Sequence, residues 1–300
     1  MATLRDIRRR IRSVQSTQKI TRAMKLVAAA KLRRAQERIM EARPYAFKMA
    51  ELVATLARAL GEDKHPLLAR REGQRKLFVV ITADKGLCGA FNANILRRSQ
   101  EALRASPDGA ASLVAVGRKA RDFYRRRSWR IRADRVGWLD RLTFVQARDL
   151  TGELMRVYLE DEVDEVWLVF NEFRSVAVQR VVIQRLLPIE ARDAGGGAEA
   201  GGGGGAGGGG LDYLYEPDAA TILGALLPRH VEIQVYRALL ESAAGEQGAR
   251  MTAMEAATKN AQEMIGTLTI QYNKARQERI TKELLDIVGG AEALRRSAEA

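Results

Sequence analysis

The sequence predicts an α/β protein in which the two ends of the chain form a long antiparallel coiled coil and the middle forms a domain with a mostly parallel sheet. Residues 1–60 contain no glycine and a single proline, Pro44. The last 50 residues or so carry a second long apolar repeat of helical period. Between them, continuous apolar runs alternate with amphipathic stretches, which is typical of strands and helices in an α/β domain.

Residues 1–60 fit a seven-residue repeat, which predicts an N-terminal coiled-coil helix. One seam position holds Leu4, Ile11, Leu32, Ile39, Val53 and Leu60, and the other holds Ile7, Val14, Ala28, Ala35, Met49 and Leu56. Only Gln18, Thr21 and Lys25 place polar groups in this seam. We expect a local gap in the packing at these three residues.

A C-terminal helix is predicted over residues 217–296, with Asp218 or Pro217 at its start and interruptions near Pro228 and Gly245–Gly248. Its second half carries two apolar stripes whose phase shifts near residues 276–279: Met251, Met254, Ala261, Ile265, Leu268, Tyr272 and Ala275, then Ile280, Leu284, Ile287, Ala291 and Leu294. Ordinary globular helices run about 8 to 20 residues. Both terminal stretches are longer, which favours their pairing over two separate helices packed on a globular core.

The net charge of the chain is concentrated on the N-terminal helix. Residues 1–60 hold 15 Lys and Arg against 4 Asp and Glu, so they supply +11 of the total +13. An acidic protein partner is one interpretation of this charge, and nucleic acid is the alternative. Because no aromatic residue precedes Tyr45, stacking on bases is not supported by the sequence.

The segment 75–190 alternates between predicted strands and helices. Strands are expected at Leu77–Thr82, Ser112–Val116, Val166–Phe170 and Val176–Leu187, and helices at Asn92–Leu103, Arg118–Arg126 and Thr143–Glu160. This order predicts a Rossmann-like domain with a mostly parallel sheet. The turn at Thr82–Asn92 lacks the spacing of either common phosphate-binding loop, so we expect it to serve chain reversal.

The sequence offers little material for catalysis or metal binding. Cys88 is the only cysteine. Of the two histidines, His65 precedes Pro66 and His230 follows Pro228-Arg229, and we expect both at solvated loop or helix-end positions. We therefore expect no catalytic residue, cofactor or metal. Residues 194–210 contain 12 of the 26 glycines and predict a flexible loop. No apolar run reaches the 18 residues of a membrane span, and the regular N-terminal repeat argues against a transit peptide.

Three segments of the chain resemble the gamma subunit of the F-type ATP synthase, the central stalk of its catalytic head. They are residues 7–29 around Ile20-Thr21-Arg22-Ala23-Met24-Lys25, the turn Asp84-Lys85-Gly86-Leu87-Cys88-Gly89 with Phe91-Asn92, and residues 249–291, which include Tyr272-Asn273-Lys274-Ala275-Arg276-Gln277. The resemblance covers nearly the whole chain. Two departures are a longer glycine-rich segment and the pair Gly245 and Gly248, which should weaken the helix by roughly 1 kcal/mol each.

The resemblance implies a rotor shaft with no chemistry of its own, which couples rotation of a membrane ring to conformational changes at distant catalytic sites. The implied partners are three alpha and three beta head subunits, the epsilon subunit and the membrane c-ring. The implied location is the cytoplasmic face of the bacterial plasma membrane, as a peripheral part of a proton-transporting complex. The competing hypotheses are a basic coiled-coil scaffold or nucleic-acid-binding protein, and an α/β enzyme with helical arms.

The resemblance also implies contact residues. Arg22, Met24 and Lys25 match positions that meet an acidic segment of a catalytic subunit, and Arg276, Gln277 and Thr281 match positions at a second loop of a catalytic subunit. Tyr213 and Glu216 match the foot that touches the membrane ring.

Overall fold

The computed structural model describes residues 3–60, 65–107, 109–176, 178–189 and 218–299, with side chains except at 58–60 and 292–299. The chain divides into two compact units. The first, called the helix-pair unit here, comprises Met1–Val27 and Met251–Ala300. The second, the sheet unit, comprises Ala28–Arg250. Both long helices, α1 (Leu4–Leu60) and α5 (Ala219–Glu299), contribute to both units.

The sheet unit is built on five strands in the order β3-β2-β1-β4-β5. They are β1 (Lys76–Ile81), β2 (Ala111–Val116), β3 (Ile131–Arg135), β4 (Glu165–Phe173) and β5 (Gln179–Leu187). The first four run parallel, and β5 pairs antiparallel with β4. The predicted mostly parallel sheet is confirmed. Sequence analysis missed β3, because this short strand carries two arginines and one aspartate and is only half-buried.

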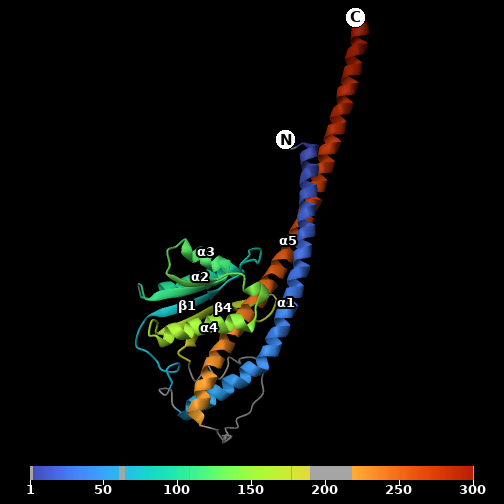
Figure 1. Cartoon of the computed structure of the whole chain (residues 1–300). Helices are drawn as coiled ribbons and strands as arrows, with labels where there is room; N and C mark the ends of the chain where they lie inside the picture. Colours follow the sequence, from blue (N-terminus) through green and yellow to red (C-terminus); the bar gives the residue numbers. More distant parts are fainter. Residues whose placement is uncertain (1–2, 61–64, 108, 177, 190–217, 300) are drawn as a thin grey trace. The chain divides into compact units, whose positions relative to one another are not determined.

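Helices cover both faces of this sheet (Figure 1). The β1-β2-β3 crossovers place α2 (Phe91–Arg104) and α3 (Arg118–Arg125) on one face, and the return to β4 places α4 (Phe144–Leu159) on the other. Right-handed crossovers that change direction along the sheet produce this arrangement. A capping box between Thr143 and Gln146 starts α4.

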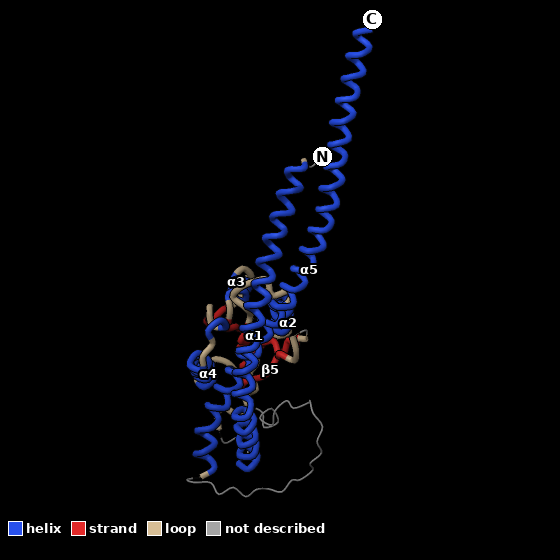
Figure 2. The backbone as a smooth tube through the Cα atoms, turned by 90° about the vertical axis from the view of Figure 1, so that its right-hand side faces the viewer, coloured by secondary structure: helices blue, strands red, loops and turns tan. Residues whose placement is uncertain are grey.

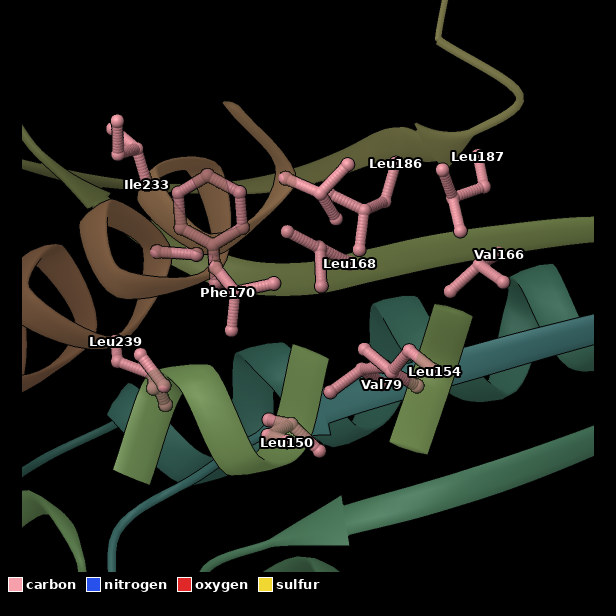
Figure 3. Close-up of a cluster of buried hydrophobic side chains, with 14 of the residues drawn as sticks. Val79, Leu150, Leu154, Val166, Leu168, Phe170, Leu186, Leu187, Ile233 and Leu239 are labelled. Carbon is pink, nitrogen blue, oxygen red and sulfur yellow. The ribbon is translucent and has the colours of Figure 1, made fainter. Parts of the chain in front are cut away.

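The larger core lies on the α4 face and includes both long helices. Strand residues such as Val79, Leu168 and Phe170 pack with Leu150 and Leu154 of α4 and with Ile233 and Leu239 of α5 (Figure 3). The α1 seam joins the same core through Leu32, Ile39, Met49, Val53 and Leu56. Within the sheet unit, the coiled-coil seam of α1 is therefore buried against the α/β domain as well as α5.

In the helix-pair unit, α1 and α5 run antiparallel side by side (Figure 2). The predicted seam residues Ile7, Met254 and Ala261 are buried. The rest of both seams up to Ala275 is half-buried or hydrogen-bonded across the pair, as the residue-by-residue burial shows. The antiparallel pairing of the two chain ends is thus confirmed.

The expected interruptions in the C-terminal helix were wrong. Helix α5 is continuous from Ala219 to Glu299, with Pro228 inside it, and Asp218 caps its start by accepting the backbone N–H of Thr221 at 2.9 Å. A Cβ atom built at Gly245 would lie 3.3 Å from Phe91, and one at Gly248 would lie 3.3 Å from Phe173. These two glycines therefore pack closely against Phe91 and Phe173 of the sheet unit, and α5 stays helical where helix propensity alone predicts an interruption.

The expectation of a solvated His230 was also wrong. This residue lies within α5 and is only 4% exposed. Its Nδ1 atom has no hydrogen-bond partner among the described residues, and burial lowers its pKa to about 4. The predicted glycine-rich loop, residues 194–210, lies outside the described residues.

Candidate partner-binding surface

Three polar contacts join α1 to α5 in the helix-pair unit, and we call them the polar ladder. Lys25 Nζ lies 2.6 Å from Glu255 Oε1, and the hydroxyls of Thr21 and Thr258 lie 2.8 Å apart. In the third rung, the Gln18 amide donates to the Gln262 carbonyl oxygen. Successive rungs are three or four residues apart on both helices, which is the spacing of one helix face.

The polar ladder corrects the expected packing gap at Gln18, Thr21 and Lys25. The Thr21 side chain is only 8% exposed, and the neighbouring Ala28 is 1% exposed, so the seam is closed there. Sequence analysis missed the other half of the ladder, Glu255, Thr258 and Gln262. Their spacing matches that of the three polar residues on α1 when read in the antiparallel direction, and this was the available signal.

The first set of predicted contact residues lies beside this ladder. Arg22 is exposed, Met24 is half-buried, and Lys25 is engaged by Glu255. Apolar side chains are exposed nearby, since Ile20 is 57% exposed and Leu26 is 66% exposed. The three predicted residues therefore occupy one short stretch of α1 that presents both positive charge and apolar surface.

The pairing of the two helices ends where α1 begins. Continuing the spacing of the ladder along both helices places Leu4 opposite about residue 276 of α5. Beyond that point α5 continues past the start of α1 (Figure 1, Figure 2). The second apolar stripe of the C-terminal helix is accordingly exposed rather than packed, with Ile280 at 51%, Leu284 at 58% and Ile287 at 71%.

The second set of predicted contact residues lies at the start of this unpaired stretch. Arg276, Gln277 and Thr281 are all exposed. Gln277 and Thr281 border a shallow hollow along one helix face, whose lining is Lys274, Gln277, Glu278, Thr281, Lys282 and Leu285. Because one helix alone forms this hollow, another chain must supply the opposite wall of any closed site. Tyr213 and Glu216, the predicted foot, lie outside the described residues.

In the sheet unit, the turn after β1 is held by its own chain. Asp84 accepts hydrogen bonds from the backbone N–H groups of Arg118 and Gly137, both at 2.9 Å. Arg250 of α5 donates to the carbonyl oxygen of Gly86 at 3.2 Å. Strand order changes direction between β1 and β4, and α/β folds bind ligands at such a switch point. Here α5 lies against that edge, so chain reversal and packing account for the glycines of the turn.

A buried ion pair and a buried cysteine lie near this turn. Glu246 and Arg250 form an ion pair at 2.7 Å with both side chains at most 10% exposed, and burial raises the pKa of the Glu246 carboxyl despite the nearby arginine. Cys88 is also buried, and burial raises the pKa of its thiol. A neutral thiol is a poor nucleophile. Among the described residues no group of His, Cys, Asp and Glu could hold a metal ion.

Comparison with known proteins decides the family. The family model described as ATP synthase matches residues 3–294. The chain belongs to this family. Curated members named ATP synthase gamma chain align over their full lengths. The protein of Heliobacterium modesticaldum is 50% identical over 294 residues, and that of Moorella thermoacetica is 50% identical over 299 residues. Both alignments cover 98% of this chain and 100% of the relative.

Solved structures of the same family share the fold. One chain of the Tetrahymena thermophila mitochondrial ATP synthase central stalk and c-ring is 26% identical, with a TM-score of 0.58, covering 79% of this chain and 99% of that one. A chain of the Euglena gracilis mitochondrial ATP synthase is 22% identical with a TM-score of 0.68, covering 99% and 96%. In the part of this chain that the structure describes, every helix is too short or too polar to cross a bilayer.

Proposed function

We propose that this chain is the central rotor shaft of a proton-translocating ATP synthase. It couples rotation of a membrane ring to successive conformational changes at catalytic sites carried by other subunits, and it has no catalytic residue of its own. The observation that carries this proposal is the full-length alignment with proteins named ATP synthase gamma chain, at 50% identity. The exposed, apolar end of α5 supports it independently, because such a helix needs a surrounding partner.

The partners in this proposal are three alpha and three beta head subunits, the epsilon subunit and the membrane c-ring. The chain would be peripheral, on the cytoplasmic face of the bacterial plasma membrane. The Tetrahymena chain belongs to a structure described as central stalk and c-ring, which supports the same placement here. Tyr213 and Glu216 are the proposed contacts with the ring.

The contacts with the catalytic subunits would come from two places in the helix-pair unit. Arg22, Met24 and Lys25 provide a basic patch for an acidic segment, in which a partner carboxylate would compete with Glu255 for the Lys25 ammonium group. Arg276, Gln277 and Thr281 provide hydrogen-bonding groups on the unpaired part of α5. By the spacing of the polar ladder, Arg22 lies opposite about residue 258 of α5, so the nearest residues of the two places are about 18 residues apart, roughly 27 Å along the helix axis.

Co-assembly tests the proposed function. The purified chain should form a complex with the two large head subunits, should not hydrolyse ATP alone, and should not shift a DNA fragment at about 0.15 M salt. ATP hydrolysis by the isolated chain would support an α/β enzyme instead. A DNA shift at that salt concentration would support the nucleic-acid-binding alternative.

Substitution tests the contact residues. Arg276→Ala combined with Gln277→Ala should lower ATP turnover of the assembled complex and leave the circular dichroism of the free chain unchanged, because both side chains are exposed. Lys259→Ala with Asn260→Ala is the matched control, since these residues are exposed on the paired part of the same helix. Equal ATP turnover in the two variants would contradict the proposal that Arg276 and Gln277 contact a catalytic subunit.

A further inference from the structure

The outer surface of α2 and α3 is unusually basic. The two helices lie side by side on the sheet, joined by a 2.6 Å hydrogen bond between the hydroxyls of Ser99 and Tyr124. Their inward residues are apolar or hydrogen-bonded. Six exposed cations of α2, α3 and the residue after α3 have no ion-pair partner among the described residues, and we call this set the cationic face: Arg97, Arg104, Arg118, Lys119, Arg125 and Arg126.

The acidic residues of these two helices are already neutralised. Glu101 pairs with Arg98 at 3.1 Å, and Asp122 pairs with Arg121 at 2.9 Å. The six side chains of the cationic face have no ion pair or hydrogen bond to any other described residue. Close like charges on a helix repel one another, so an anionic partner would relieve a cost that the isolated chain carries.

The opposite helix layer shows that this basicity is local. Helix α4 carries Arg148 and Arg156 together with Asp149 and Glu153, so its charges balance. The sheet unit therefore has one face with mixed charges and one with a single sign. A single-sign face attracts and orients an oppositely charged partner.

The composition of the cationic face indicates which anion it fits. Five of its six residues are arginines, whose planar guanidinium groups bind carboxylates and phosphates in a bidentate manner, so the surroundings of the arginines decide between these two anions. No large apolar side chain is exposed among the described residues from 91 to 135. Phe123 and Trp129 are half-buried and pack edge-on against Tyr124. The face thus lacks the apolar anchors of a membrane-binding surface and the exposed rings on which nucleic-acid bases stack.

We propose that the cationic face docks an acidic segment of another protein, rich in Asp and Glu, whose carboxylates are bound by arginines of α2 and α3. This inference goes beyond the proposed function, whose head contacts all lie in the helix-pair unit. A contact made by charge without an apolar core is fast to form and weakens with salt, because screening acts over about 10 Å at 0.1 M ionic strength.

Site-specific crosslinking tests this proposal in the assembled complex. Lys119→p-benzoylphenylalanine places a photoreactive group on the exposed side of α3. The variant is first checked for co-purification with the head subunits, because failure of the unsubstituted chain to co-purify would contradict the proposed function rather than this inference. Irradiation should then join α3 to a protein segment that mass spectrometry identifies as rich in Asp and Glu. A lipid adduct, a nucleic-acid adduct, a segment poor in carboxylates or the absence of any adduct would overturn the proposal.

Charge reversal provides the matched comparison. Arg125→Glu with Arg126→Glu should lower the crosslinking yield at least about fivefold at low salt. The control, Arg141→Glu with Arg148→Glu, changes the net charge by the same amount at residues outside the cationic face and should leave the crosslinking yield unchanged. The yield with unsubstituted arginines should also fall between about 0.05 M and about 0.5 M salt. Equal yields in the two charge-reversal variants would show that charge at this face does not hold the partner.

Discussion

The two halves of α5 occupy different surroundings although they belong to one unbroken helix. Between residues 239 and 250, nearly every side chain is buried, including those of Glu241, Glu246 and Arg250. Between residues 276 and 291, every described side chain is exposed, including several leucines and isoleucines. Residues 239–250 hold six Ala, Gly and Ser and three charged residues, whereas residues 276–291 hold five Ile, Leu and Val together with six charged residues.

This contrast shows that residue type alone does not report burial along α5. In the buried half, small residues allow α5 to approach the rest of the sheet unit closely, and each buried charged side chain has an ion-pair partner. In the exposed half, apolar side chains have no partner within the described chain, which is typical of a surface that another protein covers. The first half is thus adapted to this chain's own fold, and the second to an assembly.

The largest expected effect comes from breaking a buried ion pair. Arg250→Met should destabilise the isolated chain by about 3 to 5 kcal/mol, because it leaves Glu246 buried without its partner. Arg279→Met breaks the exposed pair with Glu283, which is 2.8 Å long, and should cause no measurable change. Urea unfolding of both variants measures the difference, and equal effects would contradict the contrast between the halves.

His230, in the buried part of α5, should make the stability of the folded chain depend on pH. Burial lowers the pKa of this imidazole from 6.5 to about 4, so the unfolded chain binds its proton more readily than the folded chain. Stability from this residue is complete above about pH 6.5 and is lost as the pH falls toward 4, by about 3 kcal/mol in total.

Unfolding curves of the wild-type chain and His230→Leu measure this contribution. Their difference should change over that pH range and remain constant above it. His65→Gln is the control, because His65 is only half-buried and should account for a smaller part of the pH dependence. Parallel curves for wild type and His230→Leu would show that His230 does not become protonated on unfolding.

Glycine substitutions compare the packing of the two parts directly. Gly245→Leu should destabilise the chain by about 1 to 3 kcal/mol, because even its Cβ would lie 3.3 Å from Phe91 and 3.4 Å from Asn171. Gly266→Leu should be neutral or slightly stabilising, by about 0.5 to 1 kcal/mol, since nothing lies within 4 Å of its Cβ and leucine favours helix. Thermal unfolding separates the two, and a destabilised Gly266→Leu would reveal a packed site there.

The smallest effect on stability is expected at the exposed end of α5. Leu284→Ser with Ile287→Ser should leave unfolding of the isolated chain almost unchanged, because both side chains are more than half exposed. The same variant should reduce assembly with the head subunits, which analytical gel filtration measures. A large loss of stability without loss of assembly would reverse the interpretation of this region.

Much of the fold follows from local sequence patterns. The strand β1 is a continuous apolar run, and both α1 and α5 show seams whose described residues are buried or half-buried where the helices pair. The missed strand β3 and the wrongly expected break at Gly245–Gly248 share a cause. In both cases contacts with distant residues, such as β2 for the strand and Phe91 for the helix, override the preference of the local sequence.

The candidate surface follows from the sequence less completely. Arg276, Gln277 and Thr281 follow from the family resemblance, and the structure adds their exposure on the unpaired part of α5. The partner of Lys25 was missed because Glu255 lies 230 positions away along the chain. Only the antiparallel direction of the two helices, which no local pattern contains, brings these residues together.

The contact between Arg250 and Gly86 has a consequence for where a small-molecule inhibitor could bind this α/β domain. The edge of the sheet that accommodates a small molecule in many enzymes is used here to fasten a helix of the same polypeptide. An inhibitor aimed at that edge would have to displace a covalently attached competitor present at very high effective concentration. Compounds that act on this chain should therefore target its outward-facing helix surfaces.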